Sequence, residues 1–200
     1  MNFLAHCALG RSHPHYLVGS YLGDFVKGSV PSDLPALIQV GIRLHRRIDA
    51  FSAVQPDIKD SVLRLPPATR RLAPVFVDLV ADHFLALHFR TLYGEPLEQF
   101  TSHAYRTLSD HEVLLPTSAA RFMRFAREHD VFGSYVSTGP VERAFGRICA
   151  RLGRDDDVAA CMQTFVREYD AFDADFRRYY PALRTHAELW LRDADSPNAR

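Results

Sequence analysis

The chain has 200 residues, 47% of them hydrophobic, and its 24 basic and 24 acidic side chains leave no net charge. This size suits one compact domain, and the balanced charge excludes a general attraction to nucleic acid or to a membrane surface. The N-terminus lacks the basic start of a signal peptide, and no apolar run reaches the roughly 18 residues of a membrane span.

Helical periodicity dominates the chain, and no segment alternates in the manner of a strand. We expect helices over 2–9, 15–27 and about 33–51. Gly19 and Gly23 leave one side of the second helix bare, so another backbone can approach it there. Residues 54–67 contain three prolines and predict mostly short helix and loop.

The most hydrophobic helix is expected over 74–93, where Gly94 ends it. Further helices are predicted over 97–113, from 117 onward, over 141–152, and from 155 to Pro181, which ends or kinks the helix before a last segment at 182–191. The prediction is therefore a single all-α domain of about seven to nine helices over 1–192, with a disordered tail at 193–200.

Three cysteines, Cys7, Cys149 and Cys161, have neither disulfide-like nor metal-binding spacing. We expect them to be small core residues in a reducing compartment. Together with the absence of a targeting or membrane segment, this predicts a cytoplasmic protein.

The helix at 74–93 carries Asp78, Asp82 and His83, although it is apolar on almost every face and is expected to be buried. Buried carboxylates and imidazoles are costly unless they are paired or bound to a metal. Asp78 and Asp82 are also one turn apart, which is unfavourable without a cation or proton between them. This helix therefore predicts a partner for its charges, and a metal ion is the strongest candidate.

Other candidate ligands are His6, Asp24, and His45 with Asp49, which lie four residues apart on one helix face. Histidine and carboxylate ligands suit Mn²⁺, Mg²⁺, Fe²⁺ or Zn²⁺, and packed helices can direct them inward to one point. Each has a simpler interpretation. His6 could be a hydrogen-bonded core histidine, Asp24 could pair with Lys27, and His45 with Asp49 could be an ordinary ion pair.

A cluster of arginines accompanies these candidates along the sequence. It could be a solvated face, or it could bind phosphate or an acidic partner, because guanidinium groups match those oxyanions. The cluster comprises Arg43, Arg46, Arg47, Arg64, Arg70 and Arg71. No P-loop, GxGxxG, GxSxG, HExxH or paired CxxC motif is present, so dinucleotide binding and nucleophilic-serine chemistry have no support.

Four motifs in order, MNFLAH at the start, GSYLGDFVKG at 19–28, GIRLHRRIDAF at 41–51 and TRRLAPVFVDLVADHFL at 69–85, resemble the acyl carrier protein phosphodiesterases. The aromatic-rich segment YDAFDADFRRYYP in the C-terminal half resembles them as well. These bacterial enzymes are regarded as divergent relatives of the HD phosphohydrolases. The resemblance implies an HD-phosphohydrolase-like helical fold.

The implied activity is removal of the phosphopantetheine arm from holo acyl carrier protein with a divalent metal, typically Mn²⁺, with Mg²⁺ or Fe²⁺ as alternatives. The functional residues implied by the resemblance are Asp24, His45, Asp49, Asp82 and His83. The last two stand in the order Asp-His, reversed from the HD order of the wider superfamily.

On this basis we expect Asp24, His45, Asp82 and His83 to bind the metal, with Asp49 completing the ligand shell or orienting His45. Asp82 and His83 should form one wall of the site and face the other ligands. Asp78 becomes a further candidate if the site holds two ions.

Arg46 and Arg47 are expected to neutralise phosphate charge or receive an acidic helix of the carrier protein, and Arg70 with Arg71 to widen that docking patch. Two alternative functions stay open at this point. One is a metal-dependent phosphohydrolase of the same fold that acts on a nucleotide or another small phosphodiester. The other is a helical protein that binds acyl carrier protein without cleaving it.

Overall fold

The computed structural model describes residues 1–194, and within them all regular secondary structure is helical, with no strand. The predicted all-α class is confirmed, but the expected seven to nine helices are too few. The described residues form eleven α-helices and two short 3₁₀ helices: α1 (Phe3–Leu9), α2 (Pro14–Leu22), α3 (Ala36–Ser52), α4 (Pro56–Arg64), η1 (Pro67–Thr69), α5 (Ala73–Tyr93), α6 (Leu97–Asp110), η2 (Glu112–Leu114), α7 (Thr117–Glu128), α8 (Val131–Ser134), α9 (Gly139–Leu152), α10 (Asp156–Arg167) and α11 (Tyr169–Ala194).

The additional helices are short ones that lie next to helix-breaking residues. Pro56 stands in the first turn of α4, where its missing N–H costs nothing, so the proline-rich segment still forms a nine-residue helix. Asp130 accepts a hydrogen bond from the backbone N–H of Gly133 and thereby caps the one-turn helix α8. Short helices of this kind depend on caps and packing and have almost no periodic signal of their own.

The long C-terminal helix was expected to break at Pro181, but it breaks at Glu168 instead, and Pro181 lies inside α11. The packing explains this difference. The helix before the break, α10, packs on α9 and η1, whereas α11 packs on α3, α4 and α5. The chain changes direction where its neighbours change, and contacts along both halves of α11 hold the helix together across the proline. The predicted tail at 193–200 lies for the most part outside the described residues.

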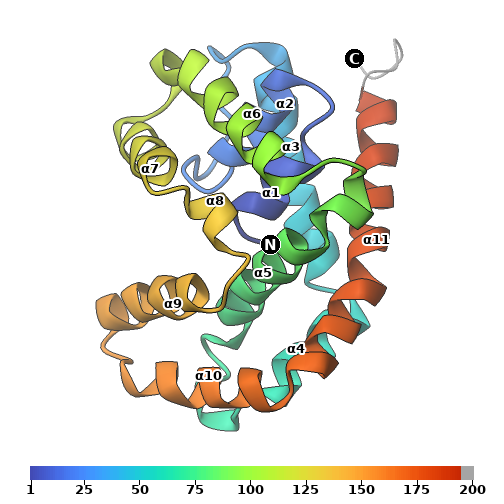
Figure 1. Ribbon diagram of the computed structural model, residues 1–200. Coiled ribbons are helices and arrows are strands. Elements are labelled where there is room, and N and C mark those ends of the chain that lie inside the picture. Colours follow the sequence, from blue (N-terminus) through green and yellow to red (C-terminus); the bar gives the residue numbers. More distant parts are fainter. Residues whose placement is uncertain (195–200) are drawn as a thin grey trace.

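Helix α5 passes through the middle of the molecule, and α11 curves along one side of it (Figure 1). Helices α1, α2 and α3 gather near one end of α5, and α9 and α10 lie near the other (Figure 1). The expected burial of α5 is confirmed, because Phe76, Phe84 and Phe89 on different sides of the helix are all inaccessible to solvent. Each such side chain contributes about 2–3 kcal/mol by burial, so α5 anchors the core. It ends at Gly94, whose φ of +74° suits glycine.

The backbones of α2 and α3 touch where two glycines face each other. A Cβ atom on Gly19 would lie 2.2 Å from the carbonyl oxygen of Ile38, and one on Gly41 would lie 2.5 Å from that of Tyr16. No larger residue fits without separating the helices. This approach, which the bare side of α2 predicted, brings the polar residues of α3 against α1 and α2.

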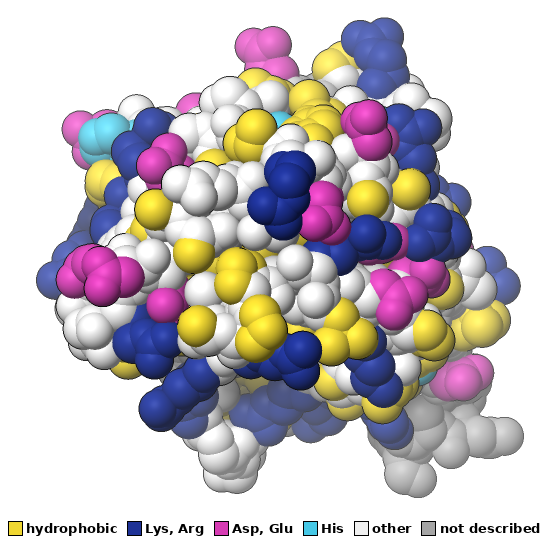
Figure 2. Space-filling model, turned by 90° about the horizontal axis from the view of Figure 1, so that it is seen from below, with side chains coloured by type: hydrophobic (Ala, Val, Ile, Leu, Met, Phe, Trp, Pro, Cys, Tyr) yellow, Lys and Arg dark blue, Asp and Glu magenta, His cyan; other side chains and the backbone are white. Residues whose placement is uncertain are grey.

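None of the described helices is long and apolar enough to cross a bilayer. The three cysteines are buried and unpaired, as expected for core residues. Seen from below, the face near α4, α9 and α10 mixes acidic, basic and hydrophobic side chains over its centre, while basic side chains gather along its lower edge (Figure 2).

Candidate metal centre

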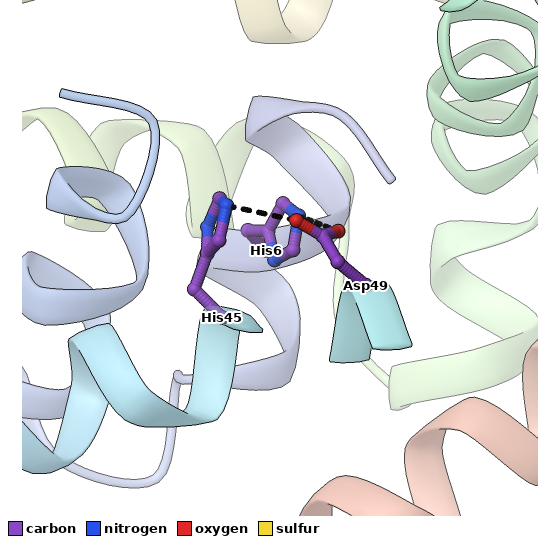
Figure 3. Close-up of side chains that lie close together, drawn as sticks. All are labelled: His6, His45 and Asp49. Atoms are coloured by element: carbon purple, nitrogen blue, oxygen red, sulfur yellow. Dashed lines mark ion pairs between the residues drawn. The ribbon is translucent and has the colours of Figure 1, made fainter. Parts of the chain in front are cut away.

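Two histidines and one aspartate from two helices meet at a single point: His6 on α1, and His45 and Asp49 on α3 (Figure 3). His6 Nε2 lies 3.1 Å from Asp49 Oδ1, and His45 Nε2 lies 3.2 Å from Asp49 Oδ2. The two imidazole rings stack with their centroids 3.6 Å apart. One potential ligand atom from each residue lies within 4.8 Å of the others, and no other group of three or more in the described part of the chain meets this criterion.

The ring of His45 is held by α2. Its Nδ1–H donates to the carbonyl oxygen of Ser20 over 2.8 Å, which leaves Nε2 directed at Asp49. A Cβ atom on Gly23 would lie 2.1 Å from Cγ of the ring, so the ring occupies the space that any other residue would fill. A histidine with one nitrogen on a backbone carbonyl and the other facing a carboxylate is oriented as metal-binding histidines are.

The ring of His6 is fully buried without a hydrogen bond. Neither of its nitrogens has a hydrogen-bond partner among the described residues, because the approach of Nε2 to Asp49 is close but poorly aligned. Burial, reinforced by the neighbouring His45, lowers the pKa of His6 to about 3. The imidazole is therefore neutral near pH 7, and a nitrogen lone pair is available to a ligand.

Asp49 remains ionised in the same place. Burial alone would raise its pKa, but His45 and His6 beside the carboxylate outweigh that effect and hold the pKa well below its usual range. Its side chain is 47% exposed, so one side of the group is open to solvent. The result is one carboxylate and two histidines, of which at least His6 is neutral. This is a donor set that suits Fe²⁺, Mn²⁺ or Zn²⁺.

Two further carboxylates lie around the open side. Asp24 Oδ1 lies 4.0 Å from His45 Nε2, and Asp78 Oδ1 lies 3.0 Å from the amino nitrogen of Met1, which in turn is 3.4 Å from Asp49 Oδ1. Their side chains are 39% and 34% exposed. Burial raises the pKa of Asp24, with His45 opposing, and burial raises that of Asp78, with the Met1 amino group opposing. The Met1 amino group offsets part of their mutual repulsion, and a further cation would relieve the rest.

Asp82 has a partner that is not a cation. Its Oδ2 and Oδ1 accept hydrogen bonds from the backbone N–H groups of Leu4 and Ala5, over 3.0 and 2.9 Å. These are free donors in the first turn of α1, and the N-cap residue Asn2 makes no side-chain bond to them. Asp82 thus caps α1 from α5 and fixes the helix that carries His6. Burial raises its pKa to about 7 even though both N–H groups lower it.

The structure does not bring His83 into this group. Its Nδ1 lies 2.7 Å from the carbonyl oxygen of Tyr135, and its Nε2 lies 2.7 Å from the hydroxyl of Tyr169. Adjacent residues on a helix point about 100° apart, so Asp82 and His83 face different neighbours. The two do not form one wall opposite His45.

The four arginines expected to meet the substrate lie on two surfaces. Arg46 and Arg47 line a hollow of about 310 Å³ with Arg43 and Trp190. Arg70 and Arg71 follow η1, and Arg71 lines a separate pocket of about 110 Å³ with Leu72, Leu152 and Arg154.

Sequence reasoning named His6 as a candidate but left it out of the expected ligand set, because a single histidine on an apolar face is most often a core residue. The signal that pointed to it was its place in MNFLAH, the first of the four motifs. The contributions of the Ser20 carbonyl and of Gly23 to the orientation of His45 left no signal that could be read without the fold.

Comparisons with known proteins match the chain along most of its length. The family model described as acyl carrier protein phosphodiesterase matches residues 1–183. An acyl carrier protein phosphodiesterase of Klebsiella pneumoniae (strain 342) is 32% identical over 192 residues, which cover 94% of this chain and 98% of the relative. Relatives with the same description are 31% identical in Enterobacter sp. (strain 638), with the same coverage, and 29% identical in Escherichia coli O127:H6, over 94% of this chain and 97% of the relative. No solved structure matches the chain.

Proposed function

This chain belongs to the acyl carrier protein phosphodiesterase family, and from that premise we propose that it removes the phosphopantetheine arm from holo acyl carrier protein. The relatives match over almost the whole chain, so the proposal concerns the chain as a whole. The observation that carries it is the buried group of His6, His45 and Asp49, whose two histidines share one carboxylate while His6 lacks any hydrogen bond.

We propose that His6, His45 and Asp49 hold a divalent ion, most favourably Mn²⁺, and that Asp24 reaches the same ion beside His45. An ion bound there would polarise a phosphoryl oxygen and lower the pKa of a water molecule toward neutrality. In the reaction one bond forms between phosphorus and the water oxygen, and the bond between phosphorus and the serine oxygen breaks. The released proton passes to the serine oxygen. The products are apo carrier protein and 4′-phosphopantetheine.

The side chains around the site contribute orientation and charge. Ser20 holds Nδ1 of His45, so that Nε2 stays directed inward. Asp24, Asp49 and Asp78 carry more negative charge than the Met1 amino group between Asp49 and Asp78 can neutralise, so a bound divalent ion would favour an anionic phosphodiester at the open side. Metal binding would then strengthen substrate binding as well as supply chemistry.

For Asp82 we propose a positioning role in place of the ligand role expected from the sequence, because both of its oxygens accept N–H groups of α1. His83 would act similarly through Tyr135 and Tyr169, at the other side of α5. Loss of Asp82 should then release the end of α1 and displace His6.

Arg46 and Arg47 are proposed to meet the anionic substrate, since Arg46 also reaches the segment after Asp24 through the carbonyl oxygen of Val26, over 3.1 Å. Arg70 and Arg71 are proposed to contact the carrier protein at the edge of the surface that it covers. We also propose a cytoplasmic location, in which the three unpaired cysteines stay reduced.

The test is incubation of the purified protein with holo acyl carrier protein, with mass spectrometry to detect the loss of the arm. We expect conversion to apo carrier protein that stops on chelation and returns with Mn²⁺. Metal content measured in the same samples should fall in the variant Asp49→Ala. If the protein hydrolyses nucleotide phosphodiesters but leaves holo carrier protein uncleaved, it is a phosphohydrolase with another substrate. Binding of the carrier protein without conversion would indicate a non-catalytic binding protein.

A further inference from the structure

One surface of α3 carries positive charge that no acidic side chain neutralises. Arg43, Arg46 and Arg47 stand at positions i, i+3 and i+4, so they share one side of the helix. With Trp190 of α11 they line the hollow of about 310 Å³, and no carboxylate lines it. We call these four residues the arginine–tryptophan surface.

Several other arginines of the described chain are paired with carboxylates. Arg64 and Arg178 bind Asp175, and Arg154 binds Asp157. By contrast, none of the three arginines on α3 forms an ion pair within the described residues. Arg43 reaches only Gln39, over 3.4 Å, and Arg46 reaches only the carbonyl oxygen of Val26. Neighbouring like charges on a helix destabilise it slightly, so an unneutralised set favours an anionic partner from outside.

The position of this surface sets a minimum size for that partner. On α3, Arg43 and Arg47 project roughly opposite to His45, and a helix with its side chains is about 10–12 Å across. Arg46 lies between the two sides and contacts Val26, two residues after Asp24. A ligand that reaches both the candidate metal centre and the arginine–tryptophan surface must therefore extend around a helix, which a protein with its modified serine on the outside can do.

We propose that the body of the carrier protein docks on the arginine–tryptophan surface through an acidic segment with an apolar side chain that packs on Trp190. This inference rests on the proposed function and specifies where its substrate is held. Partly exposed tryptophan and arginine together are typical of the residues that dominate protein interfaces. The surface of Arg70 and Arg71 fits this role less well, since its pocket is smaller and the second arginine there, Arg154, is already paired with Asp157.

The experiment compares Arg43→Glu and Trp190→Ala with Arg71→Glu, which tests the rival surface, and Arg151→Glu, an exposed control on α9. For holo carrier protein we expect KM to rise about tenfold in the first two variants, corresponding to the loss of one interface anchor, with kcat within about twofold. Raised ionic strength should increase the wild-type KM more than that of Arg43→Glu. Hydrolysis of bis(p-nitrophenyl) phosphate and Mn²⁺ binding should be unchanged, and circular dichroism should confirm folding.

Trp190 is the only tryptophan in the sequence, so its fluorescence reports docking directly, even without turnover. Addition of holo carrier protein should change the emission of the wild type with a Kd that weakens in Arg43→Glu. An unchanged KM in both variants, with an unchanged Kd in Arg43→Glu, overturns the inference while leaving the proposed function intact. A raised KM in Arg71→Glu alone assigns docking to the other surface. If holo carrier protein is never hydrolysed, the proposed function fails, and docking is then decided by the fluorescence titration alone.

Discussion

Two clusters of ionisable side chains in this protein differ in how completely the chain itself supplies their hydrogen bonds. Between α4 and α11, the inaccessible carboxylate of Asp175 accepts hydrogen bonds from Ser61 Oγ at 2.8 Å, from Arg64 Nε at 2.9 Å and Nη2 at 3.2 Å, and from Arg178. Around the candidate metal centre, His6 is equally buried but its nitrogens lack hydrogen bonds.

The difference indicates what each cluster is for. A buried charge that the chain itself satisfies joins helices, whereas a buried polar group left without a partner costs stability unless a ligand supplies one. The Asp175 cluster should therefore govern folding, and the His6 cluster should govern activity. Four predictions test this division.

The largest expected effect is on activity, in His45→Ala and Asp49→Ala. Removal of a group that holds charge at the reacting centre should lower kcat/KM for holo carrier protein about a thousandfold. In Asp49→Ala the free energy of unfolding of the metal-free protein should change little, because the Asp49 side chain is half-exposed. In His45→Ala it should also fall, because that variant removes a buried ring bonded to the Ser20 carbonyl. Steady-state assays and urea unfolding measure the two quantities, and a loss of stability that matched the loss of activity would contradict the division.

The next effect is on stability, in Asp175→Ala. Without its carboxylate the guanidinium groups of Arg64 and Arg178 lose their buried partner, and we expect a loss of about 3 kcal/mol. The activity of the molecules that remain folded should be near normal. Asp57→Ala is the control, since it removes the more exposed partner of Arg178 and should cost at most about 1 kcal/mol.

A smaller effect is expected when the ring of His45 is displaced without being removed. In Gly23→Ala the new methyl group would overlap the ring and force it away from the Ser20 carbonyl. We expect Mn²⁺ affinity to fall about tenfold to a hundredfold by calorimetry, as for other losses of ligand orientation. Gly146→Ala is the matched control, because a Cβ atom there meets nothing within 4 Å. Equal affinity in the two variants would show that the orientation of His45 does not matter.

The smallest effect is a pH dependence that His6 adds to stability. Its pKa is about 3 in the folded protein and 6.5 ordinarily, so below pH 6.5 the unfolded chain binds a proton that the folded chain rejects. The contribution of neutral His6 is complete above pH 6.5 and is lost progressively toward pH 3. In the presence of a chelator, lowering the pH from 7 to 5 should reduce the free energy of unfolding of the wild type by about 1–2 kcal/mol more than that of His6→Gln. Urea unfolding of both proteins at the two pH values measures this difference. A shift of zero would mean that the pKa of the ring in the folded protein is close to its ordinary value.

The sequence alone determined the all-α class, the burial of α5 and the pairing of His45 with Asp49, because periodicity and i,i+4 spacing are local properties of a helix. It also indicated the family, through motifs that are read without a fold. The sequence alone did not predict the helix break at Glu168 or the position of Pro181 inside α11, since packing on different neighbours decided both.

Only the tertiary structure decided which charges meet. Asp82 was expected to need a cation, but the first turn of α1, 77 and 78 residues away in the sequence, supplies its hydrogen bonds. The same helix brings His6 onto His45, and contact between Gly19 and Gly41 closes α2 on α3. Composition and spacing identify residues that need a partner, but the identity of that partner depends on helix packing, which arises from contacts between distant parts of the chain.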